Sequence, residues 1–223
     1  MAQSAYQLII GNKNSSSWSL RPWLVMTRMG LSFDEIRIDL RAPDCKAQIL
    51  RHSPSGKVPA LKIGGLTVWD SLAIMEHLAD RYPDAHLWPE CSDARSIARS
   101  VCLEMHAGFA ALREHCPMDF AARKPMQRLP EPVERDVRRI LAIWRDCRNC
   151  YGQNGAFLFG EFCCADAVYA PVASRLRSYI PDLGAYGDDG TAAAYIDEIF
   201  LLPEMQAWSD QVESELQAAT VED

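Results

Sequence analysis

The stretch Asn14-Ser-Ser-Ser-Trp-Ser-Leu-Arg-Pro-Trp23 places a run of hydroxyl side chains between a strand pattern and a helix pattern. The apolar run Tyr6–Ile10 before it is typical of a short buried strand. From Ser19 to Met29 apolar residues recur at helical spacing, with Pro22 in the first turn and Gly30 after the end. A helix start directs free N–H groups and a positive dipole into the preceding turn, so the hydroxyls predict either a helix cap or an anion site.

Strand and helix patterns continue to alternate after this helix. Residues 33–39 alternate like a half-buried strand, and Asp44 is positioned to begin a short helix that runs to about His52. The runs 57–63 and 66–69 flank a Gly-Gly pair and predict a hairpin, after which a helix over 72–82 stops at a proline. Residues 1–82 therefore predict a compact α/β domain with the order βαβαββα.

The chain changes character after residue 82. Residues 83–92 contain prolines and acidic side chains and are interpreted as a linker. Beyond them helical periodicity recurs, separated by Pro- or Gly-bearing breaks, over 93–116, 134–150, 164–179, 191–200 and 204–219. We expect residues 93–223 to form an all-helical C-terminal domain.

Composition narrows the possible partners. The 223 residues carry a net charge of −7 without a basic stripe, so nucleic acid is not an expected partner. The N-terminal residues lack a signal-peptide pattern and no apolar stretch approaches a membrane span, so we expect a cytoplasmic protein without membrane contacts.

The eight cysteines fall mostly inside helical or apolar patterns and are expected to be reduced thiols. Cys147 and Cys150 have redox or metal spacing but form a lone pair at a helix end; a structural role is favoured and no metal is predicted.

Two further segments could bind a ligand. Pro59 interrupts a strand pattern, which indicates either an ordinary edge strand or a cis bond after Val58 that leaves a free peptide edge for an extended ligand. Asp70-Ser71 opens a helix and is either a simple N-cap or a clamp for a zwitterion, with Asp70 on the ammonium and Ser71 on the carboxylate.

Four motifs together resemble the cytosolic glutathione transferases over nearly the whole chain. They are Ser-Ser-Trp-Ser-Leu-Arg at 16–21, Ser-Pro-Ser-Gly-Lys-Val-Pro-Ala-Leu at 53–61, Asp-Ser-Leu-Ala-Ile-Met-Glu-His-Leu at 70–78, and Gly-Glu-Phe-Cys-Cys-Ala-Asp at 160–166. Among the serine-type classes the zeta class, which includes the maleylacetoacetate isomerases, is similar at 16–21. The resemblance implies a thioredoxin-like domain that binds glutathione as co-substrate, an all-α domain that forms the second-substrate pocket, and a homodimer.

The resemblance also implies roles for individual residues. Ser16 falls on the catalytic position and would donate to the glutathione thiolate, with its neighbour Ser17 as a second candidate. Val58 would pair its backbone with the cysteinyl unit beside cis-Pro59, and Lys57 would meet the glycyl carboxylate. The γ-glutamyl end would be held by Asp70 and Ser71. The bound thiolate would then attack a small electrophilic substrate.

Other residues remain open between two interpretations. Trp18 either lines the second-substrate pocket or fills the core, as do Trp23 and Trp144. Arg175 and Arg177 either hold an anionic substrate, as the zeta class suggests, or form ordinary ion pairs. The histidines His52, His77 and His106 lie in no recognisable constellation.

The sequence departs from the family's pattern at two positions, and its fold allows one alternative function. Many relatives place Glu where Asp70 stands, and Ser or Thr where Cys163 begins a helix; since a thiol caps poorly, we expect a cost of about 1 kcal/mol in stability there. The fold alone does not prove catalysis, because folds host unrelated functions. The alternative to a transferase or isomerase is a non-catalytic protein that binds glutathione or another ligand, or serves in interactions.

Overall fold

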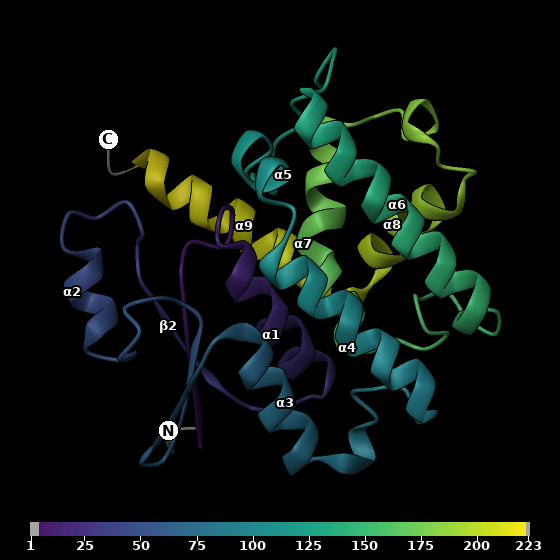
Figure 1. Cartoon of the computed structure of the whole chain (residues 1–223). Helices are drawn as coiled ribbons and strands as arrows, with labels where there is room; N and C mark the ends of the chain where they lie inside the picture. Colours follow the sequence, from purple (N-terminus) through teal and green to yellow (C-terminus); the bar gives the residue numbers. More distant parts are fainter. Residues whose placement is uncertain (1–4, 222–223) are drawn as a thin grey trace.

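A computed structural model describes residues 5–221 and contains an α/β part followed by a helical part (Figure 1). Its first part runs β1 (Tyr6–Ile10), α1 (Ser17–Arg28), β2 (Asp34–Arg37), α2 (Cys45–Leu50), β3 (Ala60–Ile63), β4 (Leu66–Trp69) and α3 (Ser71–Arg81). The strands form one sheet in the order β2-β1-β3-β4, in which β1 is parallel to β2 and antiparallel to β3. This is the predicted βαβαββα order.

The two faces of the sheet are buried by different helices. Leu8 and Ile10 of β1 pack in the main core with side chains of α1 and α3, whereas Ile9 packs on the other face with Ile49 of α2. Alternate residues of a strand point to opposite faces, so the apolar run of β1 serves both layers. The N-terminal ends of α1 and α3 begin close to the sheet and define where a ligand could meet free backbone N–H groups.

The helical part surrounds one buried helix. A short 3₁₀ segment η1 (Pro83–Ala85) leads to α4 (Ser92–Ala107), α5 (Ala110–His115), α6 (Glu131–Tyr151), α7 (Cys164–Tyr179), η2 (Gly184–Tyr186), α8 (Thr191–Leu201) and α9 (Pro203–Val221). Helix α7 is buried along nearly its whole length and packs on α1, α4 and α8. It thereby joins the helical part to the α/β part. Within residues 5–221, no helix combines the length and apolarity that crossing a membrane requires.

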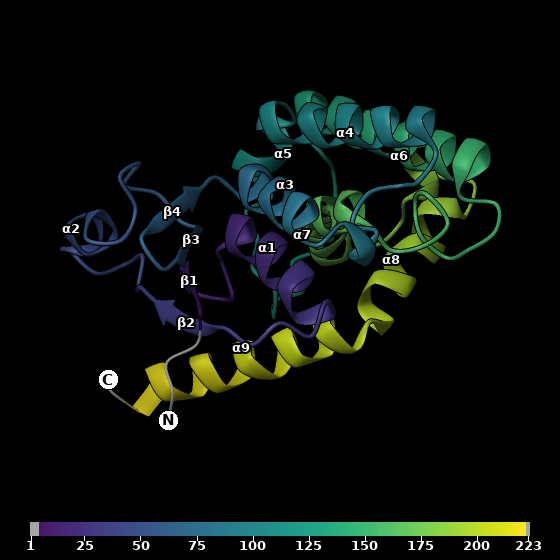
Figure 2. The ribbon, with the colours of Figure 1, turned by 90° about the horizontal axis from the view of Figure 1, so that it is seen from below.

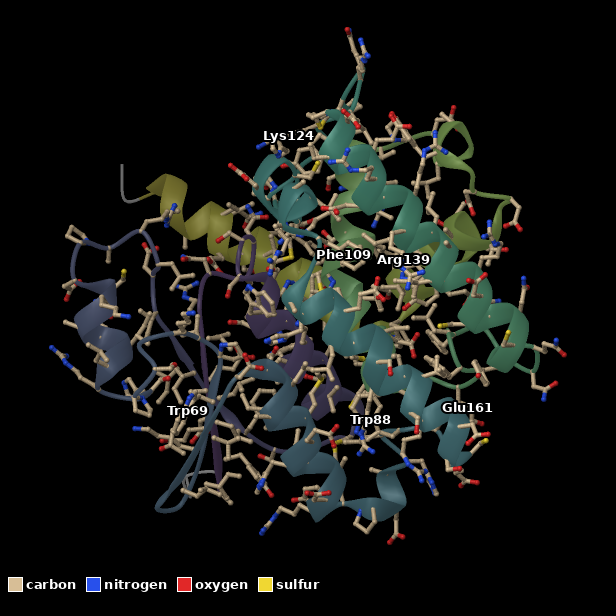
Figure 3. All side chains as sticks on the ribbon, viewed as in Figure 1. Trp69, Trp88, Phe109, Lys124, Arg139 and Glu161 are labelled. Atoms are coloured by element: carbon tan, nitrogen blue, oxygen red, sulfur yellow. The ribbon has the colours of Figure 1, made fainter. Side chains whose placement is uncertain are left out.

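The single helix predicted over 93–116 is wrong, because the chain breaks between α4 and α5. Gly108 ends α4, and Phe109 adopts a left-handed conformation with φ of 53° while its side chain stays buried. Figure 3 shows Phe109 at this junction. A left-handed aromatic residue is not encoded in helical periodicity, and burial of the ring offsets its backbone cost. The break redirects α5, so that Arg113 faces the same region as the end of α4.

The C-terminal helix α9 lies along the α/β part, below α1 and β2 in the view of Figure 2. Lys13 is central to this contact: its Nζ lies 2.7 Å from Glu35 Oε2 and over the rings of Trp23 and Trp208, at 4.7 and 4.2 Å from their centroids. Its backbone N–H donates to Glu215 of α9 at 2.9 Å. Burial lowers the pKa of Lys13, while Glu35 opposes this effect. One lysine thus connects α1, β2 and α9.

Replacing this lysine should loosen α9. We expect Lys13→Ala to lower the free energy of unfolding by about 2 kcal/mol, because it removes a buried ion pair and two cation–π contacts. Denaturant unfolding followed by tryptophan fluorescence measures the loss. The control is Arg28→Ala, which removes an exposed 3.5 Å pair with Glu204 at the other end of α9 and should change little. Equal losses in the two variants would contradict a special role for Lys13.

Candidate active site

A cavity of about 690 Å³ lies where the N-terminal ends of α1 and α3 approach the start of β3. Its walls are Trp18, Ser55, Lys57, Val58, Pro59, Trp69, Asp70, Ser71, His106 and Arg113. Trp69 stands at the end of the hairpin strand β4 (Figure 3). A larger hollow of about 1180 Å³ lies at the C-terminal ends of the same two helices, but no predicted site residue lines it. The smaller cavity is therefore the candidate site.

The segment before β3 forms one wall of this cavity. The Val58–Pro59 peptide bond is cis, which is one of the two interpretations of Pro59 and the one that the resemblance implies. The pairing of β3 with β1 and β4 begins at Ala60, so Val58 lies beyond the paired register. Lys57 is exposed beside it and brings a positive charge to the rim. The strand predicted over 57–63 is consequently shorter, because a proline has no N–H to offer a ladder.

The start of α3 forms the opposite wall. Asp70 caps the helix by accepting from the Leu72 N–H at 2.9 Å, and its backbone is left-handed, with φ of 75°. The N-cap interpretation is therefore confirmed. Its second carboxylate oxygen lies 3.3 Å from His106 Nε2. Ser71 is fully buried, with Oγ 3.5 Å from a guanidinium nitrogen of Arg21.

Arg21 supplies a buried positive charge beneath this wall. Its guanidinium lies 4.2 Å from the Trp18 ring centroid and also contacts the sulfur of Met105 at 2.6 Å. Burial lowers the pKa of Arg21 to about 10, so the group remains charged near neutral pH. Within residues 5–221 its Nε has no hydrogen-bond partner. A buried arginine next to Ser71 makes this end of the cavity attractive to a carboxylate.

The hydroxyl run divides into two hydrogen-bonded groups. Ser16 is the N-cap residue of α1 and is 6% exposed; its Oγ lies 2.7 Å from Ser19 Oγ, which accepts from the Gly11 N–H at 3.2 Å. Ser17 accepts from Arg175 at 3.1 Å. If Ser19 donates to Ser16, the Ser16 proton is free to point elsewhere. Neither Ser16 nor Ser17 is among the described residues that line the cavity.

The three residues predicted for the second-substrate pocket separate in space. Trp18 lines the cavity, whereas Trp23 and Trp144 are core residues. Arg175 is buried, and its guanidinium donates to the Cys116 carbonyl at 2.5 Å as well as to Ser17. Burial lowers the pKa of Arg175 to about 10.

Arg177 lies outside the cavity. It packs its guanidinium 4.1 Å from the Phe200 ring centroid, on the exposed side of α7. Residues 175 and 177 are two apart and so lie on different faces of one helix.

Four cavity residues were not predicted as site residues: Ser55, Trp69, His106 and Arg113, of which the last two come from the helical part. His106 belongs to α4, and its ring packs edge-on to Trp18 at 4.9 Å between centroids. Arg113 belongs to α5 and lies 5.7 Å from the same ring. Both reach the cavity through the break after α4 and through contacts with residues far away in sequence. Local sequence patterns carry no signal for contacts between residues that are far apart in the chain.

The start of α7 holds a buried carboxylate that does not line the cavity. Asp166 is fully buried and accepts from the N–H groups of Cys163 and Leu158 and from the Tyr195 hydroxyl, at 2.8, 3.1 and 3.0 Å. The Cys163 side chain and Asp166 form a reciprocal capping box. Burial raises the pKa of Asp166 to about 6.

The eight cysteines, all within the described residues, are free thiols, and Cys147 is buried near the end of α6.

Comparisons with known proteins show what this chain is similar to. Residues 15–81 match the family model "Glutathione S-transferase, N-terminal domain". A probable maleylacetoacetate isomerase from Caenorhabditis elegans is 28% identical over 100 residues, which cover 45% of this chain and 46% of that protein. The match thus spans about half the nematode protein. Maleylacetoacetate isomerase from Rattus norvegicus is 29% identical over 178 residues, covering 78% of this chain and 79% of the relative.

A solved structure extends the likeness to the whole fold. The crystal structure of a glutathione transferase homolog from Burkholderia, with bound glutathione, superposes with a TM-score of 0.70 at 20% identity and covers 94% of this chain and 98% of that one. The fold is therefore that of the glutathione transferases, with a thioredoxin-like first part and a helical second part, and residues 15–81 match the N-terminal domain of that family. The chain is also similar to a zeta-class glutathione S-transferase from Euphorbia esula, at 24% identity over 149 residues that cover 66% of this chain and 65% of that protein.

Proposed function

We propose that this protein is a glutathione-dependent transferase or isomerase in which Ser16 stabilises the glutathione thiolate for attack on a small electrophile. The observation that carries the proposal is the cavity itself, which gathers Lys57, Val58, Pro59, Asp70 and Ser71 from two separate segments. The zeta-like relatives named as maleylacetoacetate isomerases support an isomerase as the particular activity.

The cavity offers a partner to each charged end of glutathione. Val58, outside the paired register, would bond the cysteinyl unit by strand addition, and Lys57 would pair with the glycyl carboxylate. Asp70 would accept from the γ-glutamyl ammonium. Ser71 and the α3 N-terminus would hold the γ-glutamyl carboxylate, with Arg21 adding charge from below.

The sulfur would then lie toward the start of α1. There the helix dipole and the Ser16 hydroxyl both favour the thiolate over the thiol, so a nucleophile is present near neutral pH. The chain from the Gly11 N–H through Ser19 to Ser16 supports this role, because it leaves the Ser16 proton available to the sulfur. Ser17, paired with Arg175, is the second candidate.

The electrophile would enter from the side of the helical part. His106 and Arg113 of the helical part line that side of the cavity together with Trp18 of α1, and Arg175 lies behind Ser17. Because the arginines outnumber the single carboxylate of Asp70 there, an electrophile that itself carries a carboxylate is favoured. Arg177 lies outside the cavity and is given no part in catalysis.

The assembly is proposed to be a homodimer in the cytoplasm, as in the cytosolic transferases that the sequence resembles. Exposed apolar side chains support an interface: Leu66 and Trp69 on β4, and Ile97 and Leu103 on α4. Light scattering should give twice the chain mass of 25.0 kDa. A monomer at micromolar concentration would refute the dimer without affecting the site.

The test of function is a pair of measurements on the purified protein. Calorimetry measures glutathione affinity, and assays with a panel of electrophiles measure turnover, including a maleyl-type cis–trans isomerisation. Binding with turnover supports the proposal. Binding without turnover leaves the non-catalytic ligand-binding alternative, and absence of glutathione binding overturns both the enzyme and a glutathione-binding role.

A further inference from the structure

The carboxylate of Asp70 is already engaged on both sides in this structure. One oxygen caps α3 through the Leu72 N–H at 2.9 Å. The other lies 3.3 Å from Nε2 of His106, which belongs to α4 of the helical part. A ligand ammonium that reaches Asp70 therefore meets an imidazole at the same oxygen. Since His106 also lines the cavity, the two groups would compete for one acceptor.

The surroundings of His106 determine when it carries charge. Its ring is 27% exposed and packs on Trp18, and its Nδ1 is buried without a hydrogen-bond partner in the described part of the chain. The charged groups that face it are Asp70 before α3, Arg21 on α1 and Arg113 on α5. Burial, the largest effect, and the two arginines lower the pKa of His106, while Asp70 opposes them. The imidazole is thus neutral near pH 7 and takes up a proton only at a lower pH than an unperturbed histidine does.

We propose that His106 is a specificity-determining residue of the γ-glutamyl site, which admits the ligand ammonium to Asp70 when the imidazole is neutral and competes with it when protonated. The proposal rests on the proposed function, because it takes the γ-glutamyl ammonium as the partner of Asp70. A histidine of the helical part would thus directly influence a site whose other residues come from the α/β part.

The direction of the effect follows from charge. A neutral imidazole donates one hydrogen bond to Asp70 and leaves the carboxylate charge uncompensated, so an ammonium is attracted. A protonated imidazole neutralises that charge and repels the ammonium. By linkage, a proton that weakens ligand binding is itself bound less tightly in the complex. Ligand binding should therefore lower the pKa of His106 further.

The experiment measures the affinity of S-methylglutathione by calorimetry at several pH values between 5.0 and 7.5. This probe keeps the γ-glutamyl zwitterion but has no ionisable thiol, so thiolate formation does not contribute to the pH dependence. For the native protein we expect the dissociation constant to rise about fivefold or more as the pH falls across this range. A titration of the His106 ring proton by NMR, with and without the probe, should show its pKa falling on binding.

Variants separate the role of charge from that of shape. His106→Gln keeps a neutral donor toward Asp70 and should remove most of the pH dependence, whereas His106→Lys carries a fixed charge and should bind weakly throughout. The matched control is His115→Gln, which removes an exposed imidazole on α5 outside the cavity and should retain the native pH profile.

The outcomes distinguish this proposal from the function on which it rests. Failure of S-methylglutathione to bind the native protein at pH 7.5 overturns the glutathione site and this proposal together. Binding whose pH dependence is the same in the native protein and in His106→Gln overturns the role of His106 alone. An unchanged His106 pKa on binding also overturns it, even if a variant proves unstable.

Discussion

Ser16→Ala is expected to lower kcat/KM for the electrophile roughly a hundredfold to a thousandfold, the usual effect of losing one hydrogen bond to a developing or resident anion. The affinity for glutathione should change only a few-fold, because the ends of the tripeptide bind elsewhere in the cavity. The ultraviolet absorbance of bound thiolate, followed against pH, should show that the pKa of the glutathione thiol rises in the variant.

Neighbouring serines serve as matched controls for this substitution. Ser19→Ala removes the partner of Ser16 at 2.7 Å and should cause a smaller loss, because Ser16 remains but is no longer oriented. Ser17→Ala removes the partner of Arg175 and should leave the thiol pKa close to that of the native protein. If Ser17→Ala instead abolishes the thiolate signal, Ser17 is the donor and our assignment is one residue out.

Asp166→Ala should produce the largest loss of stability in the chain, about 4 kcal/mol in the free energy of unfolding. The substitution leaves the buried N–H groups of Cys163 and Leu158 and the Tyr195 hydroxyl without their acceptor. Urea unfolding measures the loss. Asp189→Ala removes an exposed cap of α8 and should cost much less. Similar losses in both variants would contradict the importance of burial.

The same carboxyl predicts a pH dependence of stability. Its pKa is about 6 in the folded protein against a usual value of 3.8, because burial disfavours the charge. The folded chain therefore binds the proton more tightly than the unfolded chain. The stabilising contribution is full below pH 3.8 and declines as the pH rises through 6, by about 3 kcal/mol at most. The difference in unfolding free energy between the native protein and Asp166→Asn, measured from pH 4 to 7.5, isolates this effect.

Local sequence patterns predicted much of the fold. The strands Tyr6–Ile10 and Leu66–Trp69 and the helix Cys164–Tyr179 lie where apolar spacing placed them, because each buries a face or a whole element in the core. The break at Phe109 was not predictable, because its left-handed backbone depends on the burial of its ring among distant helices. Tertiary packing overrides local preference at that point.

Only some residues of the candidate site could be predicted, because the others reach it through tertiary packing. Lys57, Val58, Asp70 and Ser71 follow turn and helix-start signals that are readable in the sequence, and the structure brings them to one cavity. His106 has no such signal, since its partner Asp70 lies 36 residues earlier on another element. Arg175 and Arg177 were not separable by sequence, because only the packing of α7 determines which of them is buried.

The break between α4 and α5 also determines how the site would behave under recombination. Residues up to the end of α3 contribute the peptide edge and Asp70, whereas His106 and Arg113 on either side of Phe109 come from the helical part. A chimera that joined the α/β part of this chain to the helical part of a relative would keep the tripeptide contacts. The pH dependence of binding and the preference for an electrophile would come from the relative. Tripeptide binding and these two properties can therefore be exchanged separately.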